Sequence, residues 1–271
     1  MSRSALGKGA AVAGVLAFTL FPAYFMLMSA FSEGGATGTG ALLPTSFTLE
    51  HFRYVLVEAG FLTYLRNSLI VALITVAGSS LVALLAAVAV ARFRFRLRTT
   101  VLIMVLVVQM VPLEALVIPL FLQVRDLQML NTLIGLSIVY IALALPFAVW
   151  MLRGFVAAVP KEVEEAAYID GASWPRMFWS VLLPLVAPGL VATAIFSFIT
   201  AWNEFILAMT FMNQGDKYTV AVGLRQFFGQ YTTDWPSVMA ASTIITLPVM
   251  VFFLFVQRGL VSGLVQGAVK G

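Results

Sequence analysis

The fold is decided by residues 67–98, NSLIVALITVAGSSLVALLAAVAVARFRFRLR. Residues 67–91 contain no Asp, Glu, Lys or Arg, and a run of arginines follows at once. A bilayer core requires about 20 consecutive apolar residues of helix, and Lys and Arg gather on the cytoplasmic side of membrane proteins. The stretch therefore predicts a membrane-spanning helix that ends at a basic cytoplasmic anchor. We interpret this anchor as a clamp on lipid headgroups rather than a nucleic-acid site.

The rest of the chain has the same character. Of its 271 residues, 61% are hydrophobic and only 10% are charged, whereas soluble domains carry about 25% charged residues. Cysteine is absent and His51 is the only histidine, so disulfide frameworks, thiol catalysis, haem ligation and zinc sites are excluded. A soluble enzyme is excluded as well. We expect His51 to occupy a plain surface position and no metal to be bound.

Six charge-poor segments are long enough to cross a membrane. We expect an all-α integral membrane protein whose single transmembrane domain covers residues 1–271. The first apolar segment exceeds the 7–15 residues of a signal-peptide core and lacks a convincing cleavage site, so we expect it to stay as a helix. The expected spans are about 10–31, 66–91, 101–123, 132–152, 186–209 and 238–257.

The Lys and Arg residues orient these spans. Eleven of them fall in the two terminal segments and in the loops after the second and fourth spans, against five in the other loops. This imbalance places both termini in the cytoplasm. The exterior loops are then about 32–65, 124–131 and 210–237. They either form a docking surface for another protein or merely cap the helices.

The cytoplasmic loop at 160–184, PKEVEEAAYIDGASWPRMFWSVLLP, carries the most information. Pro160 fits the first turn of a short helix, and Gly171 fits its left-handed end. Ser173 is a good N-cap for a second helix, and Pro184 and Pro188 are expected to break the chain before the fifth span. The apolar stripe of the second helix either packs against the chain's own spans or enters a groove on a partner. It consists of Trp174, Met177, Phe178, Val181 and Leu182.

The same loop resembles a known motif. The pattern EAA-x3-G-x9-[IV]-x-L-P is matched by Glu165, Ala166, Ala167, Gly171, Val181, Leu183 and Pro184, with Asp170 before the glycine. It looks like the EAA loop of ABC-importer permeases, whose coupling helix docks onto the ATPase subunit; Val181 replaces the more usual Ile. Almost the whole chain is similar to the maltose-permease-like branch, which imports carbohydrates. Supporting stretches are NSLIVAL (67–73), VPLEALVIPLF (111–121), LQMLNTLIGLSIVY (127–140), AWNEFILA (201–208) and GAVKG (267–271).

The resemblance implies a type I ABC-importer permease architecture, with six transmembrane helices and a coupling loop at about 153–185. It implies a second permease subunit in a heterodimer, two ATPase subunits that bind ATP and Mg, and an extracytoplasmic sugar-binding protein, in a bacterial inner membrane. No G-x4-G-K-[ST] phosphate loop occurs in the sequence, so ATP hydrolysis requires another chain. We expect no catalytic residue and no cofactor in this chain, and no nucleic-acid partner. The ATPase-coupling residues that the resemblance implies are Glu164, Glu165, Ala166, Ala167, Asp170, Gly171, Ala172, Met177, Phe178, Leu183 and Pro184.

Ionisable residues at membrane depth are candidates for the substrate path. Glu114 lies in the third span between two prolines, where we expect an irregular backbone. Trp202, Asn203 and Glu204 end the fifth span and offer a sugar an aromatic face and planar polar groups, although at most two can face one pore. The alternative is that Asn203 and Glu204 hydrogen-bond a neighbouring span while Trp202 lies at the membrane interface; for Glu114 it is an interhelical hydrogen bond. Weaker candidates are Gln109, Tyr140 and Asn131.

Other functions fit less well. The same fold could import a glycerophosphodiester or a polyol. A secondary transporter predicts inverted repeats with paired broken helices, and the sequence shows no convincing internal repeat. A membrane-embedded enzyme lacks a catalytic constellation, because only isolated Ser and carboxylate groups remain.

Overall fold

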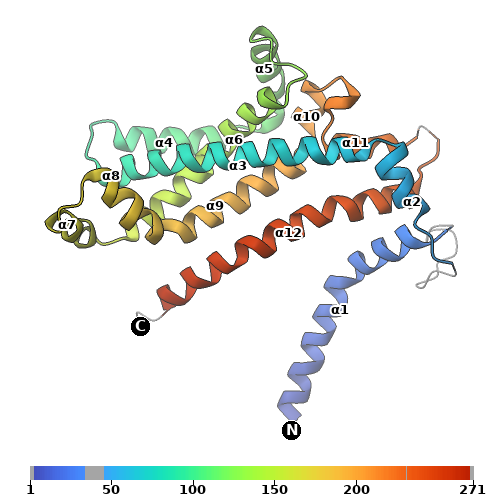
Figure 1. Ribbon diagram of the computed structural model, residues 1–271, viewed down its shortest axis with the longest axis horizontal. Coiled ribbons are helices and arrows are strands. Elements are labelled where there is room, and N and C mark those ends of the chain that lie inside the picture. The colour runs from blue at the N-terminus through green and yellow to red at the C-terminus, as the bar shows by residue number, and fades with distance from the viewer. Residues whose placement is uncertain (1–2, 34–45, 230, 269–271) are drawn as a thin grey trace. The chain divides into compact units, whose positions relative to one another are not determined.

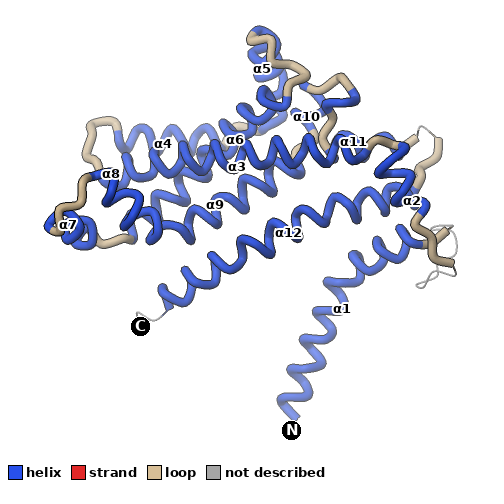
Figure 2. Tube along the Cα trace, in the orientation of Figure 1, coloured by secondary structure: helices blue, strands red, loops and turns tan. Residues whose placement is uncertain are grey.

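A computed structural model describes residues 3–33, 46–229 and 231–268, with side chains between Lys8 and Gln257. The described part is helical, with two isolated β-bridges and no strand (Figure 2). Most of the Gly- and Thr-rich exterior segment, residues 34–45, lies outside the described residues. So do Lys270 and Gly271 at the end of the tail, and the side chain of Arg258.

Long helices alternate with short ones along the chain. In order they are α1 (Arg3–Phe31), α2 (Glu50–Arg53), η1 (Tyr54–Glu58), α3 (Phe61–Arg92), α4 (Arg98–Gln109), α5 (Leu113–Asp126), α6 (Leu133–Ala158), α7 (Lys161–Ile169), α8 (Trp174–Met177), η2 (Phe178–Leu182), α9 (Leu183–Asn203), α10 (Ile206–Phe211), η3 (Gly215–Lys217), α11 (Val220–Gly223), η4 (Leu224–Phe227) and α12 (Trp235–Ala268).

Five stretches within the described residues are long and apolar enough to cross a membrane as one helix. They are Lys8–Phe31, Phe61–Arg92, Leu133–Ala158, Trp174–Asn203 and Trp235–Gln257. A sixth crossing requires α4 and α5 to act as one broken span, because they pass the same test only together. The all-α membrane fold predicted from the sequence is thus confirmed.

The expected span at 101–123 is not a single helix. α4 and α5 meet at an angle of 101° across a break of residues 110–112. Pro112 explains the break, because proline disfavours helical backbone in the residue before it and cannot donate a backbone hydrogen bond. The twelve residues of α4 span about 18 Å, well short of the roughly 30 Å of a bilayer core.

The chain divides into two compact units. The first contains Met1–Leu65 and Val222–Pro248, and the second contains Arg66–Ala221 and Val249–Gly271. In the first unit, aromatic rings pack short helices against the ends of long ones. Between ring centroids, Phe52 of α2 lies 4.8 Å from Phe31 of α1, and Phe227 of η4 lies 6.1 Å from Phe61 of α3.

The second unit contains the larger apolar core. Small and branched side chains of α3, α6 and the start of α9 pack together with larger side chains of α8 and η2. Because Gly189 has no side chain, α9 approaches the Phe155 ring of α6 closely. In Figure 1, α7 and α8 lie at one end of α3, α6 and α9, and α10 lies at the other end. The core residues are Ala83, Leu84, Ala87, Val88, Ala148, Val149, Leu152, Val156, Val159, Met177, Phe178, Leu182 and Val186.

The chain does not break at Pro184 and Pro188, contrary to the sequence prediction. α8, η2 and α9 follow one another directly, and both prolines lie within α9. The N–H of Leu183 donates to the carbonyl of Phe178, five residues earlier, in a π turn just before Pro184. Such local adjustments are how membrane helices accommodate the missing N–H of proline.

Candidate functional site

The corner between α7 and α8 is built as the sequence predicts. Gly171 has a φ of +80°, which only glycine adopts without strain. Its N–H donates to the carbonyl of Tyr168 at 3.0 Å, and the N–H of Ala172 donates to that of Ala167 at 2.9 Å. These two bonds form a Schellman motif, which closes the end of α7. Ser173 occupies the N-cap position of α8, but its side chain makes no capping hydrogen bond.

The two glutamates at the centre of α7 point in different directions. Glu165 is exposed, together with Ala166, Tyr168 and Ile169. Glu164 is buried, and its Oε1 accepts a hydrogen bond from Arg92 Nε at 2.6 Å. Arg92 therefore does not act as part of the predicted headgroup clamp, because its side chain is only 11% exposed and holds a partner on α7.

The apolar stripe that follows packs mainly against the chain itself. Met177, Phe178 and Leu182 are each at most 2% exposed and belong to the core of the second unit. Trp174 and Trp179 remain exposed. Of the other residues that the motif implicates, Asp170, Gly171 and Pro184 are exposed, and Ala167, Ala172 and Leu183 are half-buried. The outward surface of this segment is thus mostly α7 and its corner.

The opposite end of the unit is organised by Glu204. This residue leaves α9 in an extended conformation and turns its carboxylate toward the start of α10. Its oxygens accept hydrogen bonds from the N–H groups of Leu207 at 2.8 Å and Ala208 at 3.0 Å, and from the Tyr140 hydroxyl of α6. The carboxylate thereby satisfies backbone donors that a helix start leaves free, and it holds α6, α9 and α10 together.

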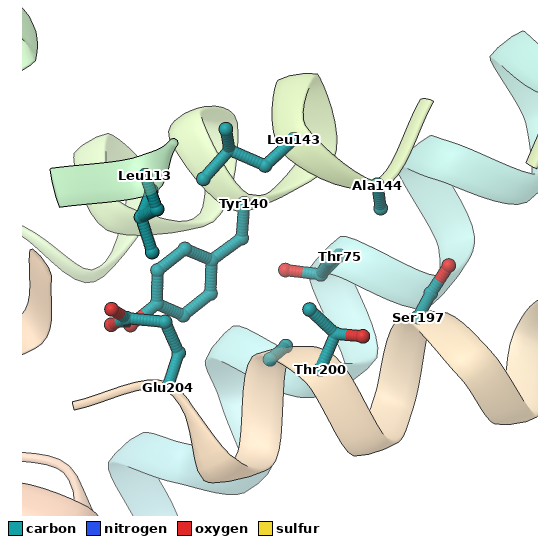
Figure 3. Close-up of a pocket in the computed structure, with 9 residues that line it drawn as sticks. Thr75, Leu113, Tyr140, Leu143, Ala144, Ser197, Thr200 and Glu204 are labelled. Atoms are coloured by element: carbon teal, nitrogen blue, oxygen red, sulfur yellow. Dashed lines mark hydrogen bonds between the residues drawn. The ribbon is translucent and has the colours of Figure 1, made fainter. Parts of the chain in front are cut away.

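Glu204 and Tyr140 also line a cavity of about 170 Å³ among α3, α5, α6 and α9. Figure 3 shows the Tyr140 ring directed toward Glu204, with Thr75, Ser197 and Thr200 along the other side. Ser197 accepts a hydrogen bond from Ser79, whereas the buried Thr75 hydroxyl has no partner within the described residues. The remaining walls are apolar: Leu113, Leu143, Ala144 and Ala201.

The other predicted substrate-path residues lie elsewhere. Trp202 is 2% exposed and stacks on Phe198 with centroids 5.3 Å apart, so it is a core residue rather than an interface anchor. Asn203 is exposed and donates to the Ile199 carbonyl of its own helix at 3.0 Å. Glu114 and Gln109 are exposed and do not line this cavity. Of Trp202, Asn203 and Glu204, only Glu204 lines the cavity.

Sequence reasoning missed Thr75, Ser197 and Thr200. Single hydroxyl groups inside apolar helices carry little signal, because Ser and Thr satisfy themselves on their own backbone. A weak sign was present: Thr193, Ser197 and Thr200 are spaced four and three residues apart, which places them on one helix face.

Asparagine side chains fix the loop after α10. Asn131 has a φ of +57°, and its Oδ1 accepts from the N–H groups of Asn213 at 2.8 Å and Gln214 at 3.2 Å. Asn67 donates to the carbonyls of Asp216 at 2.9 Å and Tyr218 at 3.0 Å. Asn131, a weaker substrate-path candidate, therefore has a structural task in this loop.

Comparison with known proteins identifies the architecture. Residues 79–266 match the family described as "Binding-protein-dependent transport system inner membrane component". The chain belongs to this family of inner-membrane permeases. It is a multi-pass membrane protein and a transport subunit, and membership implies that it works with a binding protein and an ATPase.

Relatives and solved structures agree with this assignment. The permease is 41% identical over 254 residues to the diacetylchitobiose uptake system permease DasC of Streptomyces coelicolor, which covers 93% of this chain and 92% of the relative. It is 37% identical over 255 residues to the trehalose/maltose transport system permease MalG of Thermococcus litoralis, covering 93% and 92%. Its fold matches a chain of a bacterial ABC transporter involved in alginate import, with a TM-score of 0.78, 23% identity and coverage of 95% and 98%.

Proposed function

We propose that this permease passes a sugar through the membrane as one half of a heterodimeric pore. The relatives named above serve diacetylchitobiose and trehalose or maltose, which supports a carbohydrate substrate. The observation that carries the proposal is the cavity of about 170 Å³, whose wall is mostly apolar but includes the Tyr140 ring, the Glu204 carboxylate and the hydroxyl-bearing Thr75, Ser197 and Thr200. A cavity of about 150 Å³ accommodates benzene, and a sugar ring with its hydroxyls is larger, so this cavity must widen to admit one.

A few polar side chains border this mostly apolar cavity. Sugar hydroxyls need directional hydrogen-bond partners. The Thr75 hydroxyl is fully buried and has no partner within the described residues, so it can bind a sugar only when the surrounding helices move apart. The Glu204 carboxylate already accepts hydrogen bonds from the Tyr140 hydroxyl and two backbone N–H groups. A sugar hydroxyl that donates to Glu204 must therefore share an oxygen with one of these donors. Thr75 is therefore the side chain that gains most from a bound sugar, because an unpaired buried hydroxyl is costly.

The end of the unit that carries α7 receives the movement produced by ATP hydrolysis in the ATPase subunits. In this proposal the α7 end faces the cytoplasm, as do both termini, and the exposed side of α7 docks onto an ATPase subunit. Glu165, Ala166 and Asp170 are on that exposed side. Two ATPase subunits bind ATP and Mg, a second permease completes the pore, and a sugar-binding protein docks at the other face. The chain itself supplies no catalytic residue and no cofactor.

Uptake by the assembled transporter tests the substrate path. The complex is reconstituted in proteoliposomes, and ATP-driven uptake of labelled diacetylchitobiose, trehalose and maltose is measured. If the Thr75 hydroxyl binds the sugar, Thr75→Val should slow uptake about two- to tenfold, the range of a neutral hydrogen bond.

A matched control is available on α9. Thr193 is equally buried, but its hydroxyl donates to the Gly189 carbonyl and does not line the cavity. Thr193→Val should keep wild-type uptake at equal protein level. Equal loss in both variants would show that the cavity is not the path. ATP-driven uptake of a non-carbohydrate solute, with uptake of none of the sugars, would refute the carbohydrate substrate.

A further inference from the structure

The end of α3 holds α7 through one guanidinium group. Arg92, the last residue of α3, donates from Nε to Glu164 at 2.6 Å and from Nη2 to the carbonyl of Val159 at 2.9 Å. These contacts join α3 to the α6–α7 linker and to the middle of α7. Both charged side chains are 11% exposed, so water and salt screen the pair far less than a surface pair.

Apolar packing alone holds α7 weakly. α7, which the structure describes in full, buries a single residue, and that residue is Glu164. Ala167 is half-buried and packs at the edge of the core, whereas Val163 and Tyr168 are exposed. By contrast, the following segment is fixed by Met177, Phe178 and Leu182 inside the core. Besides its contacts with α8 and η2 and the closed corner at Gly171, α7 is tied to α3 by the Arg92–Glu164 pair.

α3 connects this pair to the rest of the second unit. Ser79 donates to Ser197 of α9 at 3.0 Å, and Thr75 lines the cavity. Farther along, Asn67 and Ser68 hold the loop after α10 through Tyr218 and Val220. One continuous helix thus joins α7 to the cavity and to the far loop.

We propose that Arg92 and Glu164 form a buried strut that transmits displacement of α7 to α3, so that both act as positioning residues for coupling. This rests on the proposed function, in which an ATPase moves α7. Arginine suits the task because its planar fork bonds two acceptors at once, which a lysine ammonium does less well. Loss of the strut should leave α7 able to dock while its movement no longer reaches α3 efficiently.

The test measures sugar transported per ATP hydrolysed by the assembled transporter in proteoliposomes. Glu164→Gln keeps the size of the side chain and removes its charge; Arg92→Lys keeps the charge and removes the fork. Each should lower the ratio of transport to hydrolysis at least fivefold, while the ATPase still co-purifies and hydrolysis stimulated by the binding protein stays within twofold of wild type. Arg94→Gln, on an exposed neighbour, is the matched control and should leave the ratio unchanged.

A charge swap separates the strut from a general structural effect. Arg92→Glu alone should be the most uncoupled variant, and adding Glu164→Arg should recover at least a third of the wild-type ratio. Wild-type ratios in Glu164→Gln and Arg92→Lys, or a swap no better than Arg92→Glu, would overturn the strut. Should Arg92→Glu fail to assemble, the two conservative variants decide. A wild-type complex without ATP-driven uptake would refute the proposed function instead.

Discussion

Replacing Gly171 by alanine isolates the backbone requirement of the α7 corner. Gly171 has a φ of +80°, and a Cβ added there meets no atom within 4 Å. The substitution therefore introduces no steric clash with the surroundings. Its whole cost comes from holding an L-residue in left-handed backbone, which is roughly 1–2 kcal/mol. A free-energy change of that size alters a local equilibrium about 5- to 30-fold.

Hydrogen exchange measures this equilibrium directly. The N–H groups of Gly171 and Ala172 donate to the carbonyls of Tyr168 and Ala167, so they exchange only when the corner opens. In Gly171→Ala, the amides of residues 171 and 172 should exchange about 5- to 30-fold faster. ATP-driven uptake should fall as well, at an unchanged level of protein in the membrane.

Gly154 provides the control for the loss of a glycine. A Cβ at Gly154 also meets no atom within 4 Å, but the residue lies inside α6 with ordinary helical backbone. Gly154→Ala should be neutral or stabilising by up to about 1 kcal/mol. Unchanged exchange at residues 171 and 172 in Gly171→Ala would refute the argument, as would an equal effect of the two substitutions on uptake.

Two further substitutions test the packing of the second unit by thermal unfolding of the purified complex. Tyr140→Phe removes the hydroxyl that donates to Glu204 and should lower the free energy of unfolding by about 1.5–3 kcal/mol. Tyr231→Phe, on a side chain 91% exposed, is the control and should leave it unchanged. Equal unfolding midpoints for the two variants would show that the Tyr140–Glu204 hydrogen bond does not stabilise the protein. Gly189→Ala places a Cβ against the Phe155 ring and should cost about 1–3 kcal/mol. Adding Phe155→Ala should relieve that clash, and a Gly189→Ala protein as stable as wild type would show that α6 and α9 are not in close contact there.

Local patterns predicted the local features. The charge-free run at 67–91 and the arginines after it correctly located α3 and its end at Arg92. The glycine before a new helix start predicted the left-handed corner, which the φ of Gly171 confirms. Both signals depend only on neighbouring residues, which is why sequence alone was sufficient.

Contacts between residues far apart in the chain could not be predicted from the sequence. Arg92 and Glu164 lie 72 positions apart, and nothing local distinguishes Arg92 from the other arginines of its run. Tyr140 and Glu204 were both considered as candidates, but the sequence did not indicate that they bond each other.

The prolines were ambiguous for a different reason. The effect of a missing N–H depends on whether the surrounding helix can adjust. At Pro112 the chain bends by 101°, whereas at Pro184 a π turn lets it continue.

We propose that this permease works inside an ATP-driven sugar importer. The most direct measurement is affinity purification of the full chain from gently solubilised native membranes, with the recovered proteins identified and quantified by mass spectrometry. We expect stoichiometric recovery of an ATPase and a second multi-pass permease, together with a sugar-binding protein. Recovery of this chain alone, with solute flux that survives depletion of ATP, would contradict it.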